Sequence, residues 1–197
     1  MKAKERAKII KDIEFPDNFL KKGDLSYKII DYKGFKYIIG FCLDSTFDED
    51  SFFVQYFTQP LFIPFSTLVF TLGDRIDSYW NTNMLKELES KILNKNLPRD
   101  VDELLIYWES KFKKFNDNYK FQAIGFTYFL MSDFEKSIKE LKKVDFKDIQ
   151  NQPSWKQEEI FRIKKVLTLL EERKYEEIFE LFLNWQEFTI KSLKLKL

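Results

Sequence analysis

The sequence predicts an α+β protein, with an antiparallel sheet in the first part of the chain and helical hairpins after it. Apolar and polar residues alternate between Leu25 and Leu43, which is typical of strands with one buried face. After Trp80 the apolar residues recur at helical spacing instead. The chain has 197 residues, enough to bury a core without disulfides or metals. We therefore expect one compact domain, with a β-rich part over residues 1–80 and a helical part over residues 81–197.

The β-rich part is expected to open with a helix and to continue as a β-meander of about four strands. A helix over Ala3–Ile13 should end before Pro16, because a residue that precedes proline avoids the helical conformation. Residues 31–34 predict a hairpin turn, since aspartate leads it and glycine can adopt positive φ at its end. Pro60 and Pro64 interrupt the apolar run that follows the third strand. The expected strands are Leu25–Leu43 on either side of the turn, Ser51–Thr58 and Thr67–Leu72. Tyr27 and Ile29 are expected on one face of the first strand of the hairpin. One face of the next strand is expected to carry Phe35, Tyr37, Ile39, Phe41 and Leu43.

The helical part is expected to consist of helices that begin at recognisable caps. Asp100, with a glutamate three residues later, can cap the free N–H groups of one helix. Ser132 and Glu135 predict a capping box at the start of another. Tyr119–Met131 is apolar on nearly every side and contains Gly125, which indicates a central helix that a neighbour approaches closely. The other expected helices are Met84–Asn94, a helix from Pro153 to Leu170 and a helix from Tyr175 to Thr189.

Two segments of the helical part share a weak internal likeness. Phe121–Leu141 and Phe161–Leu181 each contain an apolar helix, a short polar turn and an aromatic-Glu pair that opens a second helix, Phe134-Glu135 and Tyr175-Glu176. The pattern over Ala123–Ile138 resembles a tetratricopeptide-type unit, although the two copies are offset by about 41 residues and that family's repeat has about 34. The resemblance covers the last third of the chain and implies helical-hairpin packing.

The absence of histidine excludes much ordinary catalytic chemistry. With no histidine in the chain, neither a Ser-His-Asp nor a Cys-His nucleophile system can form, and most catalytic zinc sites are excluded. There is no phosphate-binding G-x-x-x-x-G-K-[ST] loop and no G-x-G-x-x-G turn. The lone Cys42 lies in an apolar run, which predicts a small buried side chain in a reducing compartment. We expect no cofactor.

Charge and hydropathy narrow the class of partner. The 33 Lys and Arg residues nearly balance the 32 Asp and Glu residues, which argues against a strongly basic nucleic-acid binder. No segment has the roughly 20 consecutive apolar residues of a membrane span, and the N-terminus lacks the apolar core of a signal peptide. We therefore expect a cytoplasmic protein that has no membrane partner and binds another protein.

Acidic residues concentrate in the connector that follows the hairpin. The connector has three interpretations: a solvated hairpin loop, an acidic patch that binds a protein, or a metal site, although it lacks the residue order of a calcium-binding loop. Its acids are Asp44, Asp48, Glu49 and Asp50.

Two further candidates lie outside the connector. Asp74, Arg75 and Asp77 occupy the transition from sheet to helices, where an Asp/Arg pair could recognise a polar ligand. The alternative is a turn with a structural ion pair. Trp155 lies beside the first turn of its helix, so we expect it to be exposed, whereas Trp108 and Trp185 lie on apolar stripes.

Two functional hypotheses follow. The first is a non-catalytic interaction protein, which the missing catalytic motifs and the acidic connector favour. In composition the chain resembles small bacterial immunity proteins that neutralise a toxin, adaptor proteins and families without an assigned function. The alternative is an enzyme that uses carboxylates or a divalent metal bound by the acids of residues 44–50 and 74–77. The oligomeric state stays open.

Overall fold

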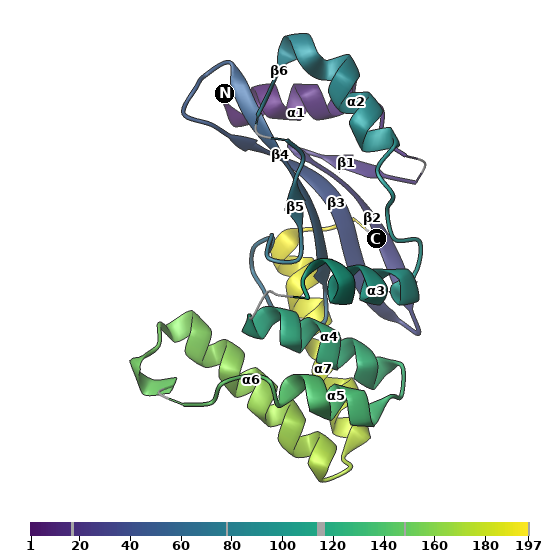
Figure 1. The fold of residues 1–197 in the computed structure, drawn as a ribbon, viewed down its shortest axis with the longest axis vertical. Coiled ribbons are helices and arrows are strands. Elements are labelled where there is room, and N and C mark those ends of the chain that lie inside the picture. Colours follow the sequence, from purple (N-terminus) through teal and green to yellow (C-terminus); the bar gives the residue numbers. More distant parts are fainter. Residues whose placement is uncertain (17, 78, 114–116, 148, 197) are drawn as a thin grey trace.

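The protein places its sheet at one end and its helical hairpins at the other (Figure 1). The computed structural model describes residues 1–16, 18–77, 79–113, 117–147 and 149–196. The β part contains α1 (Ala3–Asp12), β1 (Leu20–Lys22), β2 (Leu25–Tyr32), β3 (Phe35–Ser45), β4 (Ser51–Pro60), β5 (Asp74–Arg75) and β6 (Trp80–Asn81). The helices that follow are α2 (Leu85–Leu93), α3 (Val101–Lys111), α4 (Asn118–Leu130), α5 (Phe134–Leu141), α6 (Ser154–Glu171) and α7 (Tyr175–Leu193). The predicted α+β class is confirmed.

The sheet is an antiparallel meander built on three long strands. The strands pair in the order β1-β2-β3-β4-β5, and β6 also pairs with β4. Tyr37 pairs with Ile30 of β2 and with Pro60 of β4, so β3 is central. The predicted face of β3 is confirmed, because Phe35, Tyr37, Ile39, Phe41 and Leu43 all lie in the main core.

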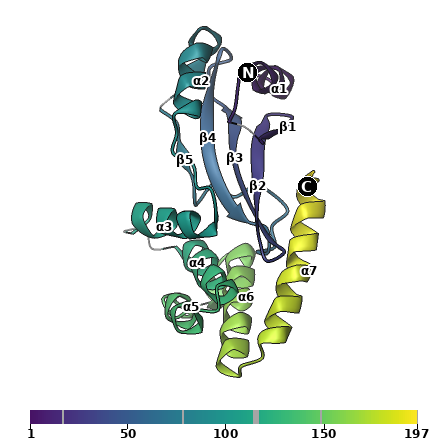
Figure 2. The same cartoon turned by 90° about the vertical axis from the view of Figure 1, so that its right-hand side faces the viewer.

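Different helices pack on the two faces of the sheet. Helices α1 and α2 cover one end of the main-core face, and α3 and α4 cover its other end (Figure 2). Trp108 of α3 donates its indole N–H to the buried Thr58 hydroxyl (2.7 Å), and Tyr37 donates to Thr127 of α4 (3.1 Å). The opposite face carries Tyr27, beneath the end of α7. The two faces therefore bury separate apolar clusters.

The strand predicted at Thr67–Leu72 is wrong. Two buried polar side chains of β4 bind this segment and take the place of a strand ladder: Val69 N–H donates to Gln59 Oε1 (2.9 Å), and the Thr58 hydroxyl donates to the Leu72 carbonyl (2.6 Å). The segment is therefore an irregular loop packed against the sheet. The short strands β1, β5 and β6 were not predicted, since two or three residues give no measurable alternation.

The helix caps follow the predictions with one exception. Asp100 accepts a hydrogen bond from the Glu103 N–H (2.9 Å), as predicted for the start of α3. At α5 the predicted Ser132 cap is wrong: Asp133 caps the helix by accepting from the Lys136 N–H (3.2 Å). Ser132 lies one residue before the cap position and adopts a φ of 65° in the preceding turn.

Helix α4 is the predicted central helix. Every residue from Tyr119 to Leu130 is buried, which matches a segment that is apolar on nearly every side. At Gly125 a Cβ atom would lie only 2.6 Å from Leu141 Cδ2, so glycine allows α5 to approach closely. None of the helices in the described ranges combines the length and hydropathy needed to cross a bilayer.

The two helical hairpins, α4-α5 and α6-α7, have the same turn. Ser132 and Arg173 adopt φ angles of 65° and 58° at equivalent positions. The next residue of each turn donates its N–H to a carbonyl five residues earlier, over 2.9 Å in both cases. The rings of Phe134 and Tyr175, which follow these turns, stack with their centroids 4.2 Å apart. The internal likeness therefore corresponds to two hairpins of similar local geometry.

Helix α7 runs back from the hairpins to the sheet (Figure 2). The buried Gln186 amide accepts from the Lys36 N–H (2.6 Å) and donates to the Gly34 carbonyl (3.0 Å) at the β2–β3 turn. Thr189 donates to the Ile63 carbonyl (3.1 Å) and accepts from the Phe65 N–H (3.3 Å). Four hydrogen bonds to backbone groups thus fix one side of α7 against two connecting segments.

Replacing Gln186 with alanine should destabilise the fold by about 1–3 kcal/mol, because the buried side chain makes two part-buried hydrogen bonds to backbone groups and both are lost. Urea unfolding measures the change. The matched control is Glu187→Ala at the neighbouring exposed position, where little change is expected. Equal unfolding midpoints for the two variants would show that the Gln186 bonds do not hold α7 in place.

Candidate functional site

The acidic connector forms an exposed hairpin loop between β3 and β4. Asp44, Asp48, Glu49 and Asp50 are all exposed. Two of the acids make local bonds: Asp44 accepts from the Ser45 N–H (2.8 Å), and Asp48 from the Asp50 N–H (3.1 Å). The Phe47 ring at the loop is fully exposed. Within the described residues, no three His, Cys, Asp or Glu side chains are arranged to hold a metal ion.

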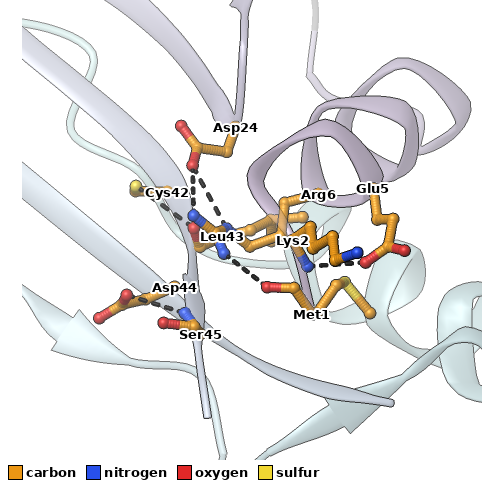
Figure 3. Close-up of polar contacts among 9 residues, drawn as sticks. All are labelled: Met1, Lys2, Glu5, Arg6, Asp24, Cys42, Leu43, Asp44 and Ser45. Carbon is orange, nitrogen blue, oxygen red and sulfur yellow. Dashed lines mark hydrogen bonds and ion pairs between the residues drawn. The ribbon is translucent and has the colours of Figure 1, made fainter. Parts of the chain in front are cut away.

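Behind this loop, Arg6 ties the N-terminal helix to the sheet. Figure 3 shows its guanidinium between the Asp24 carboxylate (3.0 Å) and the Met1 carbonyl (3.0 Å). The Leu43 N–H of β3 donates to the Asp24 carbonyl (2.9 Å). Neighbouring Cys42 is half-buried, and burial raises the pKa of its thiol to about 12. These contacts serve the structure, and the thiol is not activated.

The residues of the sheet-to-helix transition have separate partners. Asp74 forms an ion pair with Lys111, and Asp77 forms one with Lys91. The Arg75 guanidinium lies 3.9 Å from the centroid of the Phe53 ring. The three side chains therefore contact three different parts of the protein.

Trp155 lies on a groove lined by aromatic side chains. Its side chain is 64% exposed, whereas Trp80 and Trp108 are buried. The groove has a volume of about 1020 Å³ and lies between residues 64–70, α6 and α7; we call it the aromatic groove. Four of its aromatic side chains are more than one third exposed: Phe70 (38%), Trp155 (64%), Phe161 (57%) and Phe188 (50%).

The floor of the aromatic groove is held by the core. Trp185 packs against Phe126 and Phe182, with ring centroids 6.2 and 5.9 Å away. Phe65 makes an edge contact with Tyr119 (5.3 Å), and its backbone N–H is bound by Thr189. The groove is therefore largely formed in advance, which reduces the entropic cost of binding.

A smaller pocket opens beside the groove, and we call it the Glu159 pocket. It has a volume of about 210 Å³ and shares Phe65, Val69 and Trp155 with the aromatic groove. Glu159 is only 5% exposed, and its carboxyl group forms no hydrogen bond or ion pair with another described residue. The buried Tyr119 hydroxyl also lacks a hydrogen-bond partner in the described part of the chain.

Burial dominates the electrostatics of this pocket. It raises the pKa of Glu159 to about 7, and the negative charge of Asp117 adds to the shift. Lys156 and Arg162 oppose that shift. The pKa of Tyr119 is raised well above its ordinary value by burial and by the charges of Glu159 and Asp117. Strongly shifted groups in a hollow mark a candidate functional site.

The sequence predictions placed one residue of this region, Trp155, and missed the others. Phe161 lies off the apolar stripe of α6, and an aromatic residue at such a position is a detectable signal of an exposed ring. Glu159 precedes Ile163, Val166 and Leu170 at helical spacing, so a carboxylate on the buried stripe was also detectable. Phe70 falls in the predicted strand Thr67–Leu72, which the structure shows to be an irregular loop, so the sequence pattern gave no signal that its ring is exposed.

Comparisons with models of protein families, with curated proteins and with solved structures found no match to this chain. The candidate site therefore depends on its geometry and chemistry alone.

Replacing Glu159 with glutamine should change how stability depends on pH. The folded-state pKa of about 7 exceeds the ordinary 4.5, so folding favours the protonated carboxyl. The free energy of unfolding should fall as pH rises between these values, by up to about 3 kcal/mol. The Glu159→Gln variant lacks this loss, so its stability should exceed that of the wild type at about pH 8 and approach it at about pH 5.

Urea unfolding at the two pH values tests this, with Glu158→Gln at the adjacent exposed position as control. An unchanged pH dependence in Glu159→Gln would contradict the described environment of the carboxyl.

Proposed function

We propose that the protein binds another protein, and that an apolar segment of the partner lies in the aromatic groove. The observation that carries this proposal is the gathering of Phe70, Trp155, Phe161 and Phe188, all partly exposed, on one hollow surface. Exposed apolar patches of this kind mark interaction sites, and aromatic side chains are frequent energetic anchors of interfaces.

The shape of the groove favours a peptide segment as the occupant. Two helices and a loop line an open surface rich in aromatic side chains, and proteins hold amphipathic helices or extended segments on such surfaces. Glu158 and Arg162 also line the groove and supply polar contacts at its edge. An adaptor role, or an immunity role in which the partner is a toxin, is consistent with this mode of binding.

The alternative hypothesis, a carboxylate-based enzyme, gains no specific support. The acids of the β3–β4 loop are exposed, and two of them, Asp44 and Asp48, accept local backbone hydrogen bonds. Asp74 and Asp77 are each paired with a lysine. Asp48, Glu49 and Asp50 line a hollow of about 970 Å³, but their side chains are exposed, whereas Glu159 is a buried acid beside its pocket.

In a pull-down from the lysate of the source organism, the double variant Phe161→Ser/Phe188→Ser should capture at least about tenfold less of the partner than the wild type does. The serines remove apolar contact area at positions that are already half exposed, so the fold should persist. Circular dichroism and thermal unfolding verify this.

The matched control is Ile106→Ser, which changes an equally exposed apolar residue on α3, away from the groove. Undiminished capture by the double variant would overturn the proposal. So would light scattering that shows a dimer of the wild type which the double variant abolishes, because the occupant would then be a second copy of this chain.

A further inference from the structure

The Glu159 pocket opens onto the aromatic groove. Phe65, Val69 and Trp155 line both hollows, so a segment that lies in the groove passes the mouth of the pocket. A side chain from that segment can therefore enter the pocket while the segment's apolar residues stay in the groove. The chemistry of the pocket then determines which side chain is accepted.

The pocket contains polar groups that the protein leaves unsatisfied. Tyr119 is 4% exposed, and its buried hydroxyl has no hydrogen-bond partner among the described residues. Glu159 is 5% exposed as a residue and lines the cavity, and its carboxyl group forms no hydrogen bond or ion pair with another described residue. Buried polar groups without partners cost about 1–3 kcal/mol each and are rare in native proteins. The orphaned Tyr119 hydroxyl and the Glu159 carboxyl lie beside one cavity, where a ligand can supply the missing bonds.

The arrangement fits a positively charged group. A carboxylate and a hydroxyl oxygen can both accept hydrogen bonds from an ammonium or guanidinium group. The Asp117 carboxylate also lines the pocket; its Oδ1 atom caps α4 by accepting from the Tyr119 N–H (2.9 Å). The rings of Trp155 and Phe65 form apolar walls, and aromatic faces attract cations. An acidic side chain would instead meet two carboxylates of the same charge.

The basic side chains that the structure describes near the pocket do not pair with Glu159. Lys156 lines the pocket, and Arg162 lies with its guanidinium 5.5 Å from the Phe65 centroid. Within the described ranges, neither forms an ion pair with Glu159, and the Arg162 Nε atom is itself buried without a hydrogen-bond partner. The other charged group nearby, Glu158, lies on the exposed side of α6. Glu159 is thus left available to a cation from outside.

We propose that the Glu159 pocket receives the lysine or arginine side chain of a partner protein whose apolar residues lie in the aromatic groove. The inference rests on the proposed function and adds the chemistry that selects the partner: one basic side chain flanked by apolar ones. Because Trp155 and Phe65 line both the pocket and the groove, the aliphatic stem of the basic residue would lie beside these two rings.

Short synthetic peptides test this assignment on the full-length protein. One set carries a single lysine among leucine, phenylalanine and serine residues in varied order. The matched sets replace the lysine with norleucine, its neutral counterpart, or with glutamate. Fluorescence anisotropy measures binding to the wild type, to Glu159→Gln and to Phe161→Ser/Phe188→Ser. Free butylammonium, added as a competitor, distinguishes a small amine from a peptide side chain.

We expect the best lysine peptides to bind the wild type at least about tenfold more tightly than their norleucine counterparts. Glu159→Gln should lose this preference and still bind the norleucine peptides, and the double groove variant should bind neither set. The preference should weaken from about pH 8 to about pH 6 as Glu159 becomes protonated.

Three results would overturn the inference. Peptide binding without a lysine preference would leave the groove as a docking site and remove the pocket from it. Binding of butylammonium that excludes no peptide would assign the pocket to small amines. Absence of binding by every peptide would overturn both the pocket and the proposed function.

Discussion

The return of α7 to the sheet is the constraint on which the rest of the structure depends. Gln186 bonds to two backbone groups of the β2–β3 turn, and Thr189 bonds to the chain on either side of Pro64. These bonds connect the last helix to two segments more than a hundred positions earlier in the chain. They place α7 and Phe65 side by side, and the aromatic groove lies between them and α6. Without this docking the exposed rings would have no shared surface.

Buried polar groups serve two distinct purposes in this protein. Thr58, Gln59 and Gln186 are bound to backbone groups, and they define where an irregular loop and a helix lie against the sheet. The buried Tyr119 hydroxyl has no partner among the described residues, Glu159 forms no bond to a backbone group there, and both residues line a cavity. The first group stabilises the fold, whereas the second lowers stability until a ligand is bound. Buried atoms without partners also occur in the sheet, such as Tyr56 Oη and Gln59 Nε2, so the reason for placing function at the helical end is that Tyr119 and Glu159 line a cavity.

The sequence predicted local structure well and long-range placement poorly. The alternation of β3, the buried α4 and the Asp100 cap depend on residues close in the chain, and all were predicted. The loop at 67–72 was misassigned because its backbone partners are side chains of β4, which no local pattern reveals. The acidic connector was predicted as a candidate site because acidic residues are concentrated there. The groove remained hidden, since its rings come from three segments that meet only in the fold, and Trp155 alone was anticipated.

The central claim is that partner binding covers the aromatic groove and not the acidic loop. Carbene footprinting of the protein in complex with its captured partner tests this directly, because it labels exposed side chains. The account predicts that labelling of Trp155, Phe161 and Phe188 falls on binding, while labelling of Phe47 in the acidic loop and of Ile106 on α3 stays unchanged. Protection of Phe47 with unchanged labelling of Trp155 and Phe161 would contradict it.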